Sequence, residues 1–355
     1  MENENKTKET RTPSVEEKYM NLIRENACRF VVRDGYRWDN SPQIQKDEFE
    51  RILTLASFED ESSQILRYLR KMTYATSSLI EAAAKRYAKE KKRADVVVNA
   101  DYLRTLTIDL VRLGAVDRRK YVPAKTKGKT DDYLLECFTL TQRGVTLYKK
   151  FTEYAGHIEE FLVKENSIEV MRRLATNYIL SEFEPICTKT GFETRFCRTE
   201  KPRREGEPST TRRTVYGSIE GKDTFTVFEP VFYHLDPNED EDEFRTHIED
   251  RVNFLKMYLK TIDENKQKCI VFVVEDKGYI KKAWRDYAEV RDRFDLVYVT
   301  SDSLVRLASD GVAPFLRIWD PLNSDEENIS LKAHAEAPPF LEGAVKKVTR
   351  TKAKK

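Results

Sequence analysis

A helix expected over residues 99–113 carries side chains suited to reading a nucleic-acid duplex. Its leucines recur at helical spacing and predict a buried face, formed by Leu103, Leu106, Leu110 and Leu113. The opposite face is expected to be solvent-exposed and to carry Arg104, Thr105, Ile108 and Arg112. Arginine can bond guanine edges or phosphates, and the methyl groups of threonine and isoleucine can contact the thymine methyl. The chemistry expected of this face is recognition of base edges in a major groove.

Basic residues gather around this helix. From Lys85 to Lys129 there are 14 basic and 5 acidic residues in a chain whose net charge is only +2. Two groups follow the helix directly, Arg118, Arg119 and Lys120 in "DRRK" and Lys125, Lys127 and Lys129 in "KTKGK". Because half to two-thirds of protein–DNA hydrogen bonds go to phosphate and sugar, we expect these six residues to contact the DNA backbone and so position the protein on the duplex. Asp101 and Asp109, on or beside the outer face, oppose phosphate binding.

The elements that must hold this face begin at residue 61. Helical spacing predicts three successive helices, and Gly114 ends the third. "AVDRRKYV" and "YLLECFTLT" predict two strands joined by a basic loop, and "QRGVTLYKKF" begins a fourth helix. This order, with "LVRLGAVDRR" and the Leu-Thr-x-x-Gly of "LTQRG", resembles the winged-helix family over residues 61–151. The resemblance implies a winged helix-turn-helix domain, residues 61–152, whose third helix enters the major groove.

A winged helix can also contact protein, so a scaffold remains an alternative. Ile108 separates the two hypotheses. An Ile108 exposed beside Arg104 favours DNA, whereas an Ile108 buried against protein favours the scaffold.

A second region with mixed α/β character is expected over residues 153–325. A long polar helix, about residues 155–183, precedes three strands in a meander, "GFETRFCRT", "RRTVYGSIEG" and "TFTVFEPVFYHL". An amphipathic helix follows over about residues 243–262. The apolar runs "KCIVFVVED" and "DLVYVTSD", separated by a helix through Trp284, are typical of a parallel βαβ unit.

This order is similar to the restriction-endonuclease-like fold. The resemblance implies an acid on the second strand and an acid-x-Lys on the third, which together bind Mg²⁺ and position water. Glu229 on the third strand is followed by Pro230 and Val231, so the lysine is missing, and Glu220-Gly221-Lys222-Asp223 is better read as a hairpin turn. We therefore expect a degenerate domain without catalytic residues, metal or cofactor. A Mg²⁺-dependent nuclease using Glu220, Asp223 and Glu229 remains an alternative.

Composition places the chain among cytoplasmic globular proteins. Its 355 residues are 39% hydrophobic and 35% charged, which is enough for two or more domains. The N-terminal residues lack the apolar run of a signal peptide, and no stretch approaches the roughly 20 apolar residues of a membrane span. The five cysteines are widely spaced without a C-x-x-C pair, so we expect reduced thiols.

The predicted fold class is a two-domain α+β and α/β protein, a winged helix-turn-helix followed by a mixed-sheet restriction-endonuclease-like domain. Residues 1–13 and 326–355 are expected to be disordered tails, and residues 14–60 a helical appendage. As a whole, residues 60–320 resemble the replication-relaxation proteins of plasmids and integrative conjugative elements. The resemblance implies a non-catalytic protein that binds double-stranded DNA during replication, conjugative transfer or their regulation, with a protein partner in the same complex as a further expectation.

Overall fold

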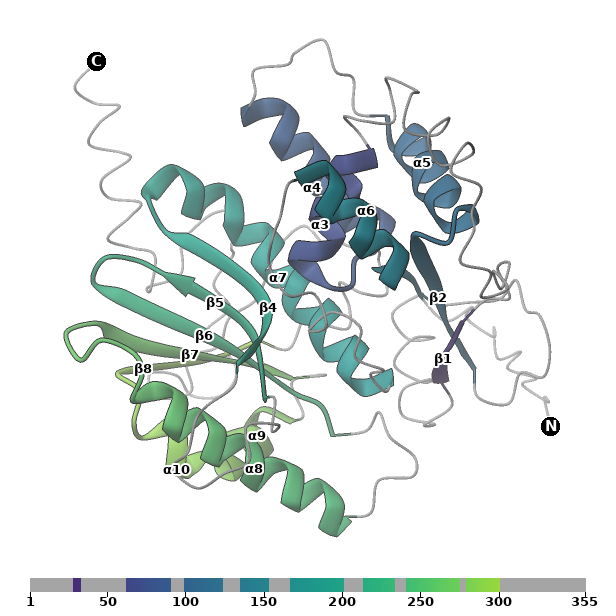
Figure 1. Ribbon diagram of the computed structural model, residues 1–355. Coiled ribbons are helices and arrows are strands. Elements are labelled where there is room, and N and C mark those ends of the chain that lie inside the picture. The colour runs from purple at the N-terminus through teal and green to yellow at the C-terminus, as the bar shows by residue number, and fades with distance from the viewer. Residues whose placement is uncertain are drawn as a thin grey trace, which may run out of the picture.

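The protein is a mixed α and β structure with two separate sheets (Figure 1). The computed structural model describes residues 28–32, 62–90, 99–123, 135–152, 167–200, 213–233, 241–274 and 279–300. The predicted tails and most of the predicted appendage lie outside these ranges. We call residues 62–152 with the strand at 28–32 the first unit, and residues 167–300 the second unit. Among the described helices, none combines the length and the apolar character that crossing a bilayer requires.

The first unit contains the predicted elements in the predicted order. Helices α3 (Ser63–Met72), α4 (Ser77–Glu90) and α5 (Ala100–Arg112) precede strands β2 (Val116–Pro123) and β3 (Leu135–Leu140) and helix α6 (Gln142–Thr152). A further strand, β1 (Cys28–Val32), pairs antiparallel with β2, which in turn pairs antiparallel with β3. Strand β2 is therefore the central strand of this sheet.

Local capping explains where α5 begins and ends. Asn99 accepts a hydrogen bond from the backbone N–H of Asp101 at 2.9 Å, which caps the first turn of the helix. Gly114 has a φ of 67°, a conformation that glycine adopts without strain, and it turns the chain from α5 into β2.

The Leu-Thr-x-x-Gly motif joins this turn to α6. Thr141 donates its hydroxyl to the carbonyl of Gly114 at 2.6 Å and accepts the N–H of Gly144 at 3.1 Å. A Cβ at Gly144 would lie 1.9 Å from the carbonyl oxygen of Ala115, so only glycine fits at this position. The motif therefore packs α6 directly on the turn between α5 and β2.

The second unit is built on a five-stranded mixed sheet. Its strands are β4 (Glu193–Glu200), β5 (Arg213–Glu220), β6 (Thr224–Val231), β7 (Gln267–Val274) and β8 (Leu296–Thr300), in that order across the sheet. Strands β4 to β6 form an antiparallel meander, whereas β6, β7 and β8 are parallel. The predicted meander and parallel βαβ unit are both present.

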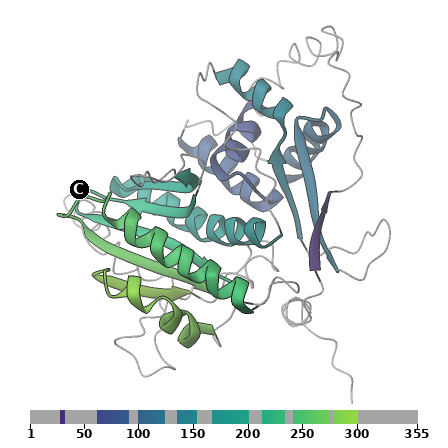
Figure 2. The same cartoon turned by 60° about the horizontal axis from the view of Figure 1, so that its bottom comes forward.

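Helices cover both faces of this sheet. Helix α7 (Ser167–Thr190) packs on β4, β5 and β6. Helices α8 (Glu241–Leu259), α9 (Ile280–Asp286) and α10 (Ala288–Arg291) lie on the other face (Figure 2). The sheet therefore lies between two layers of helices and has an apolar interface with each layer.

Helix α7 is the long polar helix that the sequence predicts before the meander. Within the described residues it begins at Ser167 and continues to Thr190, beyond the expected end at residue 183. Every residue from Val170 to Ser181 is buried, because α7 lies between the five-stranded sheet and the helices of the first unit (Figure 1). Its polar side chains therefore make buried contacts on both of its sides.

Apolar packing is continuous between the two units. One cluster of buried side chains extends from Ile65 in α3 through Leu174 and Phe183 in α7 to Phe228 and Val273 in the second sheet. A second cluster fills the space between the sheet and α8 to α10. The two units share a core through α7.

Candidate nucleic-acid interface and candidate metal position

Helix α5 lies on the side of the molecule away from the five-stranded sheet (Figure 1). On the inner side of the helix, the side chains of Leu103, Thr107 and Leu110 are buried. Four predicted positions, Asp101, Arg104, Thr105 and Arg112, are exposed. The structure therefore brings Arg104, Thr105 and Arg112 together on one outward face, as the leucine spacing predicted.

Contacts within α5 constrain two of these side chains. Arg112, which is 69% exposed, donates to the carboxylate of Asp109 at 3.0 Å. Thr105 donates its hydroxyl to the backbone carbonyl of Asp101 at 2.9 Å, so its methyl group and its oxygen lone pairs remain for an external contact. Asp101 and Asp109 offset part of the positive charge of this face.

Ile108 lies between the two positions that we expected. Its side chain is half-buried and packs against the core of the first unit. The expected fully outward position was wrong, because the side chain packs against buried hydrophobic residues. Burial of apolar surface therefore explains in part why a hydrophobic residue occurs at this position, without a nucleic-acid contact.

The three basic residues of "DRRK" are held inside the first sheet. Arg118 forms an ion pair with Glu136 on the neighbouring strand β3, and both side chains are largely buried. The guanidinium of Arg119 lies 5.3 Å from the ring centroid of Tyr74, and Lys120 is only 4% exposed. These positions do not form a continuous basic surface with α5. Lys125, Lys127 and Lys129 lie outside the described residues.

Tyr102 is an exposed residue of α5, beside this face, that was not predicted from the sequence. It is 41% exposed and is the large hydrophobic side chain that is exposed among the described residues. It lies one turn before Thr105 and Leu106 on α5. Its place outside the leucine spacing was the available signal in the sequence.

The acidic candidates of the second unit do not converge. Glu220 pairs across the sheet with Phe225, and Glu229 lies four residues further along β6, which is roughly 13 Å at the rise of a strand. Glu220 forms ion pairs with Lys266 at 2.6 Å and Arg195 at 3.0 Å, whereas Asp223 lies exposed in the turn before β6. Glu220, Asp223 and Glu229 therefore share no site, and no group of three or more His, Cys, Asp or Glu side chains suited to a metal occurs in the described ranges.

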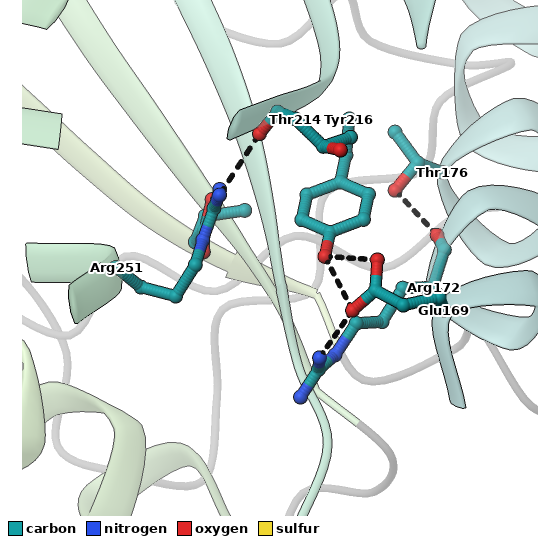
Figure 3. A network of polar contacts seen from close by, with 7 residues as sticks. Glu169, Arg172, Thr176, Thr214, Tyr216 and Arg251 are labelled. Carbon is teal, nitrogen blue, oxygen red and sulfur yellow. Dashed lines mark hydrogen bonds and ion pairs between the residues drawn. The ribbon is translucent and has the colours of Figure 1, made fainter. Parts of the chain in front are cut away.

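Glu229 instead belongs to a buried polar network through Arg251, which Figure 3 shows with its neighbours Thr214 and Tyr216. Glu229 is 1% exposed, and its carboxylate accepts two hydrogen bonds from Arg251 on α8, from Nε at 2.8 Å and from Nη2 at 2.6 Å. The remaining terminal nitrogen, Nη1, donates to the carbonyl of Thr214 on β5 at 2.9 Å. The Arg251 guanidinium also lies 4.9 Å from the ring centroid of Tyr216 and 5.0 Å from that of Phe254.

A second carboxylate, from Glu169 in the first turn of α7, lies on the other side of Tyr216 (Figure 3). Both oxygens of Glu169 accept the Tyr216 hydroxyl, at 2.9 and 2.6 Å, and Oε1 also accepts Arg172 Nη1 at 2.6 Å. Two carboxylates are thus balanced by two guanidinium groups.

Electrostatics favour the ionised forms of this network. Burial alone raises the pKa of Glu169, but Arg172 and the Tyr216 hydrogen bond outweigh it, and the net pKa lies below its ordinary value. Burial alone lowers the pKa of Arg251, but Glu229 raises it above its ordinary value. Burial and the neighbouring Glu169 raise the pKa of Tyr216 well above 10. At neutral pH Glu169 and Arg251 are therefore charged, and Tyr216 is a neutral phenol.

A divalent cation does not fit this arrangement. The resemblance to restriction-endonuclease-like folds implies Mg²⁺ held by carboxylate oxygens that have free lone pairs facing a common point. Here Arg251 occupies both oxygens of Glu229, and β6 continues with Pro230 and Val231 in place of the expected lysine. The chemistry that the network supports is the fixing of α7, β5, β6 and α8 to one another.

Glu229 was a candidate from the sequence, whereas its partners were not. Glu169, Arg172 and Arg251 come from helices whose charged residues looked like ordinary solvent-exposed positions. Arg251 falls directly before Val252 in the apolar spacing of α8, and this position at the edge of a buried face was the one signal that it contacts the sheet.

No protein-family model, curated protein or solved structure matches the chain.

Proposed function

We propose that the protein binds duplex DNA through the outward face of α5, in a winged helix formed by the first unit. The observation that carries this proposal is the exposure of Arg104, Thr105 and Arg112 on one face, opposite the buried Leu103 and Leu110. A helix of this kind fits the major groove, where arginine bonds guanine or phosphate. Three helices followed by antiparallel strands support the winged-helix assignment.

In this proposal the second unit is a nuclease-like domain that performs no cleavage. Its element order supports the fold assignment, and the pairing of Glu229 with Arg251 supports the absence of catalysis. The resemblance to replication-relaxation proteins supports a role in the replication or transfer of a mobile genetic element. The proposed ligand is double-stranded DNA.

The test begins with selection of duplex fragments by the purified full chain, followed by titration of the enriched duplex at several salt concentrations. We expect affinity to fall steeply with salt. Each lost phosphate contact makes the negative slope of log K against log salt less steep by about 0.9. Arg104→Ala is expected to relax the sequence preference at one position by about 1–3 kcal/mol. Arg112→Ala is expected to weaken binding to all duplexes.

Arg285→Ala is the matched control for Arg112→Ala. Arg285 is 76% exposed and pairs with its neighbour Asp286 at 3.3 Å, much as Arg112 pairs with Asp109, but it lies on α9 in the second unit. The two substitutions remove the same charge from similar surroundings. Equal effects on binding would mean that net charge, and not the α5 face, controls affinity.

Thr105→Ser tests base contact more closely. It keeps the hydroxyl that bonds Asp101 and removes only the methyl group. If that methyl touches a thymine, replacing the thymine by uracil should weaken wild-type binding by about 0.5–1 kcal/mol and leave Thr105→Ser unaffected at the same base. A chain that binds no duplex, or binds without salt dependence, would reject the proposal in favour of the scaffold.

A further inference from the structure

The Arg251 guanidinium occupies the position next to Glu229 that a metal ion would need. It contributes two donors to the two oxygens of Glu229 and a third to the carbonyl of Thr214. A divalent cation at this place would use the same oxygens, carboxylate and carbonyl, as ligands. The guanidinium therefore makes the contacts that would otherwise fall to the ion.

The surroundings keep Arg251 in this position. Its guanidinium is in contact with the rings of Tyr216 and Phe254, and its side chain is 9% exposed. Arginine remains charged at every pH at which a protein is folded, so deprotonation does not release it. A metal ion would have to displace a buried cation, and the nearby carboxylate of Glu169 already pairs with Arg172.

We infer that Arg251 is a built-in counter-cation that replaces a divalent metal at Glu229 and closes the second unit to metal-dependent chemistry. The Mg²⁺ that the fold resemblance implies thus fails to fit for a physical reason that lies in one side chain. It follows that loss of Arg251 opens a cation position, whereas loss of Glu229 does not. The inference is independent of DNA binding by α5.

The experiment uses the full chain, with Mn²⁺ as the probe. Thermal unfolding is recorded with Mn²⁺ and with a chelator, and bound Mn²⁺ is counted from the loss of the free-ion signal in electron paramagnetic resonance. For the wild type we expect no bound Mn²⁺ and the same Tm in both solutions. Saturable Mn²⁺ binding to the wild type that is lost in Glu229→Gln would overturn the inference.

Arg251→Met removes the cation and keeps the apolar stem between Tyr216 and Phe254. We expect a lower Tm than in the wild type, part of which Mn²⁺ restores, and no restoration in the double variant Glu229→Gln/Arg251→Met. Lys266→Met is the control, because it removes a cation from Glu220 at the other end of β5. Equal Mn²⁺ effects in Arg251→Met and Lys266→Met, or no Mn²⁺ effect in a folded Arg251→Met, would refute the equivalence of guanidinium and metal. If Arg251→Met does not fold, the wild-type measurement alone still decides whether the position is closed.

Discussion

Asn177 on α7 holds the turn between α3 and α4, and its removal tests whether the two units unfold together. Its side-chain amide is fully buried and donates to the carbonyl of Met72 at 2.8 Å and to that of Tyr74 at 2.9 Å. Between them, Thr73 has a φ of 65° and a ψ of −51°, and the N–H of Tyr74 bonds the carbonyl of Met72 at 2.8 Å. Such a γ-turn at a β-branched residue is strained, at a cost of about 1–3 kcal/mol.

The expected cost of Asn177→Ala follows from these contacts. Each hydrogen bond contributes about 1 kcal/mol net, and a buried carbonyl left without a donor costs about 1–3 kcal/mol. Both carbonyls lose the donor that Asn177 provides, and the Met72 carbonyl keeps the N–H of Tyr74. We therefore expect the free energy of unfolding to fall by about 3 kcal/mol, a large part of the 5–15 kcal/mol of a typical domain.

Urea unfolding followed by tryptophan fluorescence and by circular dichroism measures this change. Because α7 shares one core with both units, the wild type and the variant should each unfold in a single transition with the same m-value and coincident signals. Thr176→Val is the control, since Thr176 is equally buried but bonds only the carbonyl of Arg172 in its own helix, at 2.9 Å. A loss in Asn177→Ala no larger than in Thr176→Val, or separate transitions for the two signals, would contradict the reasoning.

Three further predictions follow from single sites. Gly144→Ala should lower the free energy of unfolding by about 2 kcal/mol or more in urea titration, because its Cβ meets the backbone at Ala115; an unchanged midpoint would contradict the clash. Burial raises the pKa of Cys137 to about 12 and that of Cys187 to about 11. Both thiols should therefore resist alkylation at pH 8 until urea unfolds the chain, which mass spectrometry of the peptides would show. Burial, with Arg172 and Arg251, lowers the pKa of His247 to about 4. As the pH drops from about 6.5 towards 4, the imidazole is therefore protonated in the unfolded chain before it is protonated in the folded one, and the free energy of unfolding should fall. His247→Gln should flatten this pH dependence in chemical denaturation, and an equal slope in the variant would assign the dependence to other groups.

The elements could be predicted from sequence because their signals are local. The leucine spacing of α5, the cap at Asn99 and the glycine at 114 all act within a few residues. The meander and the parallel strands were likewise legible as alternating and continuous apolar runs. Even the Leu-Thr-x-x-Gly motif was recognisable, although its cause, the close approach of Gly144 to Ala115, required the structure.

The buried network could not be predicted, because its partners lie far apart in the chain. Arg251 is 22 residues from Glu229, and Tyr216 is 47 residues from Glu169. Each contact depends on how a helix is rotated over the sheet, and the sequence offers no local rule for that rotation. The same reasoning applies to α7, whose arginines and asparagine resemble solvent-exposed positions until both sides of the helix are covered.

The "DRRK" segment shows how its place in a strand changes the role of a charge cluster. Strand β2 is the central strand of its sheet, between β1 and β3. Arg118 lies beside Glu136 of β3, and Lys120 is buried. Basic residues that are adjacent in sequence thus divide into interior charges that stabilise the sheet and outward charges on α5. The proposed DNA affinity should therefore depend on Arg104 and Arg112 far more than on the larger local charge that the sequence displays.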